Sequence, residues 1–93
     1  MMNNYKFSFD ADEDGKSFGL QIARAMVDIF DISMAEAVGR INREWKNVRI
    51  YGVNQVYRRE PEEWAKIIYY EVGTWWWVDK WMAENTPKPK PYP

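Results

Sequence analysis

The chain has 93 residues and is rich in aromatic side chains, with six tryptophans, six tyrosines and four phenylalanines, but it contains no cysteine and no histidine. Thirteen basic and fourteen acidic residues give a formal net charge of −1, and 46% of the residues are hydrophobic. This balance excludes an intrinsically disordered chain, which would be less apolar and more highly charged. The missing residue types exclude disulfide scaffolds, zinc sites built from Cys and His, and histidine-dependent catalysis.

Length and composition also bound the number of domains and the location of the protein. A chain of this size is expected to form one domain around a single core. Its start has no basic region followed by an apolar segment, and no apolar run approaches the roughly eighteen residues of a membrane span. We therefore expect neither a secretory signal nor a membrane-spanning helix. The absence of cysteine fits a reducing compartment, so the expected location is the cytoplasm.

The first predicted element is a strand over residues 5–9. Tyr5, Phe7 and Phe9 occupy alternate positions, separated by a lysine and a serine. An alternation of period two with aromatic residues is typical of a strand that has one buried face.

Two amphipathic helices are predicted next. The first runs from Lys16 to Phe30, with an apolar face made of Phe18, Ile22, Ala25, Met26 and Ile29. The second is initiated by a capping box, in which Ser33 is followed three residues later by Glu36. Its apolar face is made of Met34, Ala37, Val38, Ile41 and Trp45. Because the connection is short, the two helices should form an antiparallel hairpin.

Residues 48–59 lack a helical stripe of apolar side chains. Their valines and isoleucine, set around a glycine and an asparagine, predict one or two short irregular strands that pair with residues 5–9.

A third helix is predicted to begin at Pro61, because proline is favoured at the first helical position and the glutamates that follow suit the positive end of the helix. Its buried face should comprise Trp64, Ile67, Ile68 and Val72. Gly73 suits a left-handed C-terminal stop. Thr74 then caps a last short helix that runs from Trp75 to about Glu84.

The last eight residues, T-P-K-P-K-P-Y-P, hold four of the five prolines. Alternating proline removes backbone donors and favours extended polyproline II. We therefore place one globular domain at residues 1–85 and expect residues 86–93 to form a solvated, disordered tail. The alternative is that this tail is a proline-rich ligand for a partner groove. The fold class predicted from all these elements is α+β, mainly α: a helical hairpin, two further helices and a small β component.

Two stretches carry a resemblance to known proteins. They are A-E-A-V-G-R-I-N-R-E-W, which starts at Ala35, and E-P-E-E-W-A-K-I-I-Y-Y, which starts at Glu60. Together they resemble small, mostly uncharacterised bacterial proteins of the immunity type, the partners that neutralise toxins. The resemblance implies a protein-binding function with a toxin domain as partner, and it carries no catalytic or binding residue across.

An acidic segment, Asp10-Ala-Asp12-Glu-Asp14-Gly15, matches the opening of a calcium-binding loop. Alternating carboxylates could converge on a hard cation while the glycine allows the chain to turn. However, the twelfth position of the loop is Gln21, where a bidentate glutamate is expected. The alternative is a solvated acidic loop that caps the positive end of the first helix.

Basic residues gather between Arg40 and Arg59, where six arginines and lysines stand against one glutamate and are interleaved with aromatic residues. Bases could stack on the aromatic rings while the guanidinium groups meet phosphates, so this segment is a candidate nucleic-acid site. The near-zero net charge makes nucleic acid an unlikely partner. The alternative is a basic surface that faces solvent or an acidic protein.

Catalysis has little support in the sequence. The adjacent carboxylates Glu62 and Glu63 are explained by their place at the start of a helix, and no other pattern predicts a catalytic, metal or cofactor site. We expect a protein that is not an enzyme and that binds no cofactor.

The strongest functional signal is the concentration of aromatic residues between Tyr69 and Trp81. On a helix, three consecutive tryptophans would span about 200° of the circumference, more than one packing surface buries. Either the rings cover a thin core from outside, or some of them belong to a protein interface, as large contiguous exposed aromatics usually do. The residues assigned to this interface are Tyr69, Tyr70, Trp75, Trp76, Trp77 and Trp81. The expected partner is another protein or a second copy of this chain, and no membrane.

Overall fold

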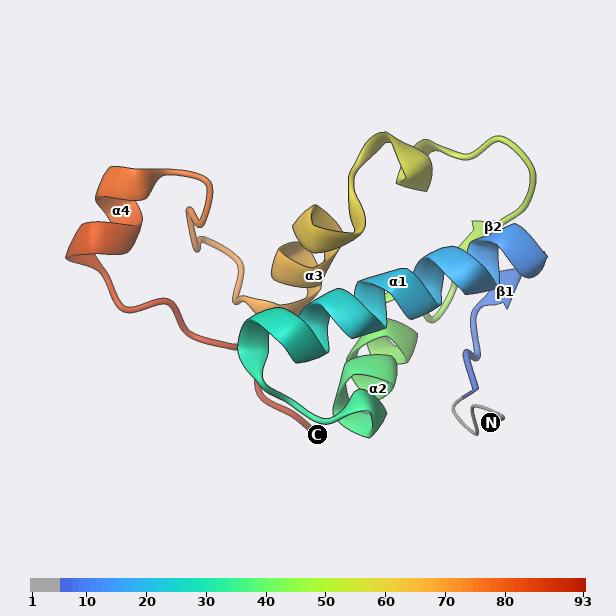
Figure 1. Ribbon diagram of the computed structural model, residues 1–93, viewed down its shortest axis with the longest axis horizontal. Coiled ribbons are helices and arrows are strands. Elements are labelled where there is room, and N and C mark those ends of the chain that lie inside the picture. The colour runs from blue at the N-terminus through green and yellow to red at the C-terminus, as the bar shows by residue number, and fades with distance from the viewer. Residues whose placement is uncertain (1–5) are drawn as a thin grey trace.

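A computed structural model describes residues 6–93 and confirms the α+β, mainly α fold class. In this part of the chain, four α-helices and a 3-10 helix accompany one parallel sheet of two short strands. A common core is enclosed by α1 (Glu13–Phe30), α2 (Met34–Glu44) and α3 (Pro61–Tyr69), and α4 (Asp79–Glu84) projects away from them (Figure 1). No helix of residues 6–93 has the length and apolar character needed to cross a lipid bilayer.

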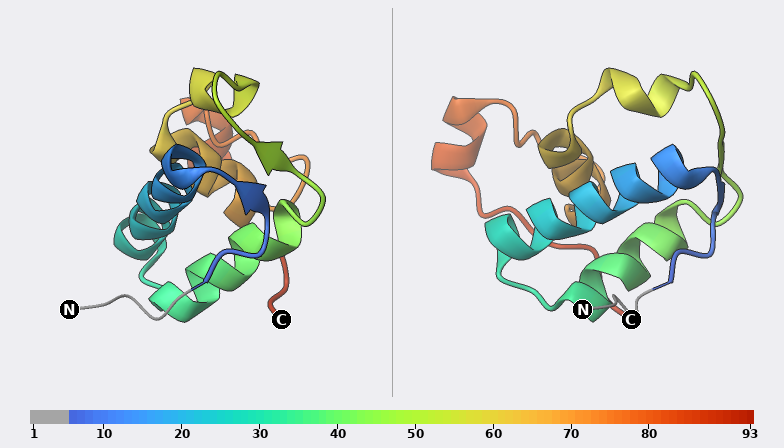
Figure 2. Two further views of the ribbon diagram at one scale, coloured as in Figure 1. Left: turned by 90° about the vertical axis from the view of Figure 1, so that its right-hand side faces the viewer. Right: turned by 45° about the vertical axis from the view of Figure 1, so that its right-hand side comes forward.

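The predicted helical hairpin is confirmed. Helix α1 (Glu13–Phe30) and helix α2 (Met34–Glu44) pack against each other, and α2 returns alongside α1 (Figure 2). Helix α1 starts three residues earlier than Lys16, because the Asp12 carboxylate accepts a hydrogen bond from the Gly15 N–H and caps the helix. The Ser33 hydroxyl caps α2 in the same way, accepting from the N–H of Glu36 at 3.0 Å.

Helix α3 (Pro61–Tyr69) starts as predicted and packs on α1. Glu60 and Glu63 form a capping box at its first turn. The chain that leads into it contains the 3-10 helix η1 (Gln55–Arg58), and the indole N–H of Trp64 donates to the Val56 carbonyl at 2.7 Å. This bond fixes the approach of the chain to the third helix.

The strand predicted over residues 5–9 is wrong for the residues described, and Tyr5 lies outside them. Strand β1 (Asp10–Ala11) instead pairs in parallel with strand β2 (Arg49–Ile50). The segment before β1 hydrogen-bonds to a side chain, since Asn42 of α2 accepts from the Ser8 N–H and donates to the Lys6 carbonyl. The backbone is therefore committed to α2 and not to a sheet.

The first turn of α1 lies directly against the small sheet. A Cβ atom at Gly15 would stand 2.8 Å from the Ala11 Cβ and 2.9 Å from the Ile50 carbonyl oxygen, closer than packed atoms approach. Glycine is therefore required here for close packing of helix on strand. Behind this contact, Phe9 is buried with its ring edge against Trp45, at 5.1 Å between centroids.

The third helix is shorter than predicted. It ends at Tyr69, because Tyr70 turns into extended backbone and forms an isolated antiparallel bridge with Pro89. Val72, expected on the buried face, is 97% exposed, and Gly73 occupies a turn at φ 94° instead of a helix stop. Residues 71–87 form a loop, here called the tryptophan loop, whose ends are joined by a hydrogen bond from the Glu71 N–H to the Lys88 carbonyl.

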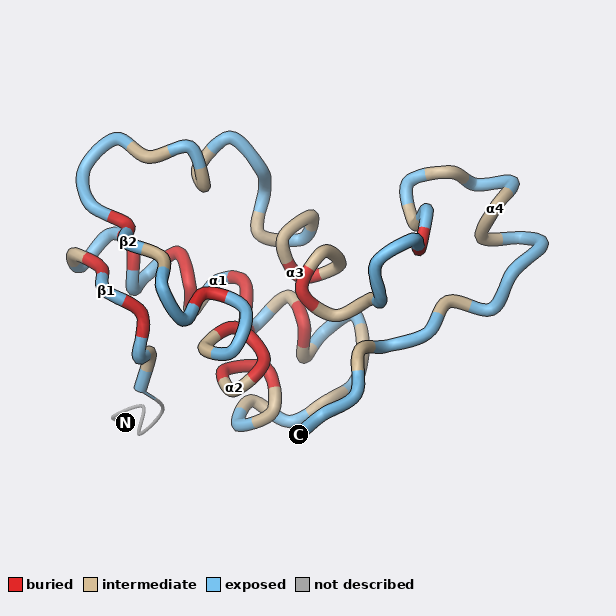
Figure 3. Tube along the Cα trace, turned by 180° about the vertical axis from the view of Figure 1, so that it is seen from behind, coloured by how far each residue is buried: buried red, intermediate tan, exposed pale blue. Residues whose placement is uncertain are grey.

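The predicted helix beginning at Trp75 is also wrong in its start. Helix α4 (Asp79–Glu84) is only six residues long, and the three consecutive tryptophans lie in the turn before it. Thr74 does not cap the helix, since its position is several residues away and Val78 precedes α4. Apart from Thr74, the tryptophan loop is exposed or half-buried, in contrast to the buried residues of α1, α2 and α3 (Figure 3).

The end of the chain is largely exposed, as its prolines predict, but it is bonded to the helices and does not form the expected disordered tail. Residues 88–92, here called the C-terminal strap, return to α2 and α3, where the Lys90 N–H donates to the Tyr69 carbonyl at 2.7 Å. The Lys90 ammonium bonds to Glu44 of α2 and to the carbonyl of Ile67. Two carbonyls of α3 and the Glu44 carboxylate thus accept hydrogen bonds from Lys90, one of the few donors in this segment.

Candidate functional site

The tryptophan loop carries the largest exposed aromatic side chains of residues 6–93. Trp75 is 53% exposed and Trp77 is 63% exposed, whereas Trp76 and Trp81 are half-buried. A turn closed by the Val78 N–H on the Trp75 carbonyl replaces the expected helix. The three indoles therefore follow a tight bend, which leaves two of them largely in solvent.

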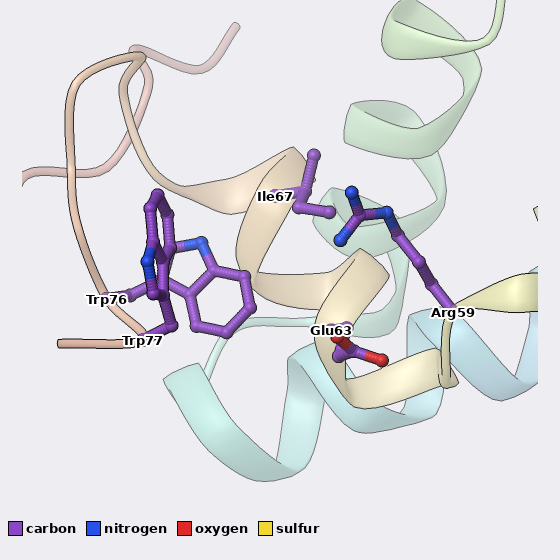
Figure 4. Close-up of a pocket in the computed structure, with 5 residues that line it drawn as sticks. All are labelled: Arg59, Glu63, Ile67, Trp76 and Trp77. Atoms are coloured by element: carbon purple, nitrogen blue, oxygen red, sulfur yellow. The ribbon is translucent and has the colours of Figure 1, made fainter.

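A pocket of about 370 Å³ lies between this bend and helix α3. Its wall on one side is formed by the Trp76 and Trp77 rings, and on the other by Glu63 and Ile67 of α3 and by Arg59, which lies two residues before this helix (Figure 4). The lining residues are Arg59, Glu63, Ile67, Trp76 and Trp77. This volume lies in the range of sites that hold small ligands or a large side chain.

The two tryptophan rings are held in a fixed mutual arrangement. Trp76 and Trp77 meet edge to face, with centroids 5.3 Å apart and planes at 86°. The Lys66 ammonium lies 5.3 Å from the centroid of the Trp76 ring, a cation–π contact that ties the loop to α3. One face of the pocket is therefore a rigid aromatic corner.

Polar groups complete the pocket. The Arg59 side chain points back along α3 toward Ile67 (Figure 4), and it makes no ion pair or hydrogen bond with any group in residues 6–93. Glu63 uses one carboxylate oxygen to accept from the Glu60 N–H at 3.0 Å. The pocket thus presents an unpaired guanidinium and a half-engaged carboxylate between apolar walls.

The two tyrosines assigned to the interface pack on Phe30 and do not line this pocket. Tyr69 stacks on Phe30 at 3.7 Å between ring centroids, and the Arg40 guanidinium lies over its ring at 4.8 Å. Tyr70 meets Phe30 edge-on, and burial raises the pKa of its hydroxyl. Both rings are half-buried at the end of the core, and Tyr70 also lines a second hollow, of about 250 Å³, together with Trp76 and Trp77.

Sequence reasoning missed three of the five pocket residues. Ile67 was assigned to the buried helix face, Glu63 to helix initiation and Arg59 to the basic segment. The half-buried Ile67 sits where α3 turns its side away from α1, which helical spacing alone did not distinguish. The sequence offers one signal for Glu63 and Ile67. Pro61 marks the start of the helix, and residues 63 and 67, four positions apart, then lie on the same side of it.

The acidic segment does not gather into a cation site. Asp10 pairs with Arg49 and accepts from the hydroxyl of Tyr51, so it faces the sheet. Asp12 accepts from the N–H groups of Gly52 and Gly15, which hold the pKa of its carboxyl below the usual value. Within residues 6–93, no three acidic side chains meet in a geometry suited to a metal ion.

The basic residues between Arg40 and Arg59 do not form one surface. Arg40 is only 4% exposed and pairs with Glu36 of the same helix at 2.8 Å. Arg43 donates to the Pro91 carbonyl, and Arg49 pairs with Asp10. Three of the six cations of this segment are thus bonded to α2, to the strap and to the sheet.

In comparisons with known proteins, no protein-family model, no curated protein and no solved structure matches the chain.

Proposed function

We propose that this protein is a non-catalytic protein-binding domain whose contact surface is the exposed face of the tryptophan loop. The observation that carries the proposal is the pairing of two largely exposed indoles, Trp75 and Trp77, with an adjacent apolar pocket. Tryptophan at the centre of an interface contributes much of the binding energy when a partner desolvates it. A contiguous exposed aromatic surface on a small domain marks such a contact.

The non-catalytic part of the proposal is supported by what the carboxylates do. Asp12 caps α1, and Glu60 and Glu63 cap α3. Hydrogen bonds from Gly52 and Gly15 lower the pKa of the Asp12 carboxyl, so this group is a weak proton acceptor. These groups serve the fold, so the site offers recognition chemistry and no evident acid–base pair.

The specific class that we propose is an immunity-type protein of the bacterial cytoplasm that neutralises a toxin domain. This class rests on the resemblance of the sequences around Ala35 and Glu60, and the aromatic face supplies a surface that such a protein needs. Toxin neutralisation requires only tight occlusion, which a rigid aromatic corner with a polar rim provides.

The test is co-expression with the polypeptide encoded by the neighbouring gene. We expect that polypeptide to arrest growth, the wild-type protein to restore growth and to co-purify with it, and Trp77→Ala to lose both effects. Val53→Ala is the matched control, because Val53 is fully exposed and lies outside the pocket. A neighbour that neither arrests growth nor binds removes the immunity class, and unaltered capture by Trp77→Ala removes the proposed surface.

A further inference from the structure

The exposed Trp75 ring takes no part in the pocket, although the next residue in the chain lines it. Trp75 precedes the pocket residue Trp76 in the chain, yet its ring lies outside the pocket lining. It is 53% exposed, and its indole N–H has no acceptor among residues 6–93. One short segment therefore carries both a solvent-exposed indole and two residues that line a hollow.

The chemistry of the hollow suits an indole. Its apolar walls are the Trp76 and Trp77 rings with Ile67, which offer edge-to-face and aliphatic contacts. The unpaired Arg59 guanidinium supplies a cation for the face of an aromatic ring. Glu63 has a carboxylate oxygen beyond the one that caps α3, and this oxygen can accept from an indole N–H.

Charge favours this neutral aromatic occupant over a strongly charged one. Lys66 already occupies one face of Trp76, so an incoming cation would meet both Lys66 and Arg59. An extended polyanion would meet the exposed Glu62 and the half-buried Glu63. An aromatic side chain with one N–H donor satisfies the two polar groups of the pocket without adding charge.

From this complementarity we infer that the tryptophan loop binds a second copy of this chain, with Trp75 of each copy inserted into the pocket of the other. A chain that carries both a projecting group and a hollow that accepts it can form a twofold, isologous interface, in which each contact is made twice. The inference rests on the proposal that the tryptophan loop is a protein contact surface, and it names a second copy of the chain as the partner. It also makes self-association and capture of a different protein mutually exclusive.

The experiment measures association of the purified full chain by light scattering and sedimentation velocity from micromolar to submillimolar concentration. We expect a monomer–dimer equilibrium that Trp75→Ala weakens at least tenfold and Arg59→Glu weakens as well. Ile29→Ala, which truncates an exposed apolar side chain on α1 away from the pocket, should associate like the wild type. Circular dichroism of each variant confirms the folded state.

A mixing experiment isolates the proposed exchange. The Trp75→Ala copy lacks the protrusion but keeps the pocket, whereas the Arg59→Glu copy has an altered pocket but keeps the protrusion. A one-to-one mixture should therefore dimerise more tightly than either variant alone, because one native contact is restored.

Two outcomes overturn the inference: a wild type that stays monomeric at submillimolar concentration, or a dimer that Trp75→Ala does not weaken. Neither outcome touches the proposed function, since a monomer could still capture its neighbour through Trp77. Conversely, a dimer that behaves as expected while the neighbour fails to bind removes only the immunity class.

Discussion

The buried guanidinium of Arg40 donates a hydrogen bond to the backbone carbonyl of Lys90 at 2.8 Å, and so joins helix α2 to a residue fifty positions later. The same guanidinium pairs with Glu36, and its cation lies over the rings of Tyr69 and Tyr92. Arg40 thus holds the C-terminal strap together with Arg43 and Glu44, and the strap in turn joins the two ends of the tryptophan loop at its neck. The binding face depends on a contact that lies outside it.

Replacement of Arg40 by methionine should release the strap. The change keeps most of the side-chain volume but leaves the Lys90 carbonyl and Glu36 without their donor, and we expect a loss of about 1–3 kcal/mol in the free energy of unfolding. Arg40→Lys should recover only part of it, because one ammonium does not reproduce the guanidinium fork. Urea denaturation measures the loss, with the exposed Arg24→Met as control.

Amide hydrogen exchange tests independently whether Arg40→Met releases the C-terminal strap. The N–H groups of Glu71 and Lys90 donate to carbonyls across the neck of the loop, so both should exchange faster in Arg40→Met. Unchanged exchange at these two amides would contradict the role given to Arg40.

Gly39→Ala should have opposite effects in two backgrounds. A Cβ atom at Gly39 would overlap the hydroxyl of Tyr92, so in the wild type the substitution displaces that ring and destabilises the strap. In a Tyr92→Ala background the obstacle is gone, and alanine should stabilise α2 by about 0.5–1 kcal/mol through its higher helix propensity. Urea denaturation of the wild type, the two single variants and the double variant measures both effects in one double-mutant cycle. Equal effects in both backgrounds would show that Tyr92 does not rest on Gly39.

Trp45 and Trp77 should separate stability from binding. Trp45 is 3% exposed and packs edge to face on Phe9 and Trp64, so Trp45→Ala should cost about 3–5 kcal/mol. Trp77 is mostly in solvent, and Trp77→Ala should change stability by less than about 1 kcal/mol. Thermal melts of both variants decide the point. A large loss for Trp77→Ala would make that ring part of the core and not of a contact surface.

Asp12 should give the protein an acid-sensitive stability component. Hydrogen bonds from Gly52 and Gly15 lower the pKa of its carboxyl in the folded state. A depressed pKa stabilises the fold at pH values above the unfolded pKa of about 3.9, and this contribution is lost as the pH falls through the lower folded pKa. Asp12→Asn keeps a capping side chain but removes the charge, so its melting temperature should fall less steeply below about pH 4. If the melting temperatures of the wild type and Asp12→Asn fall equally with pH in this acidic range, the role assigned to Asp12 is wrong.

Calcium should not stabilise the protein. Asp10 and Asp12 are bonded to the sheet and to backbone amides, so binding a cation would require breaking contacts of β1 and of the α1 cap. The melting temperature in millimolar calcium should equal that in chelator, and a rise would show that the acidic segment rearranges into a cation site.

Local signals in the sequence predict where three of the helices form. Ser33 and Pro61 fix the starts of α2 and α3, and the spacing from Phe18 to Met26 assigns the buried face of α1. These features act within a few residues, through capping hydrogen bonds and helical periodicity, so they are legible without knowledge of the partner elements.

The pairing of the remaining segments depends on tertiary contacts. The backbone of Ser8 bonds to Asn42, Asp10 pairs with Arg49, and Tyr70 bridges to Pro89. Each of these contacts joins residues far apart in sequence, and it prevails over the local preference for a strand, a calcium loop, a longer helix or a free tail. The strap shows the cause most plainly. Prolines deny it internal hydrogen bonds, so its place is set by Arg40 and by the open carbonyls at the end of α3.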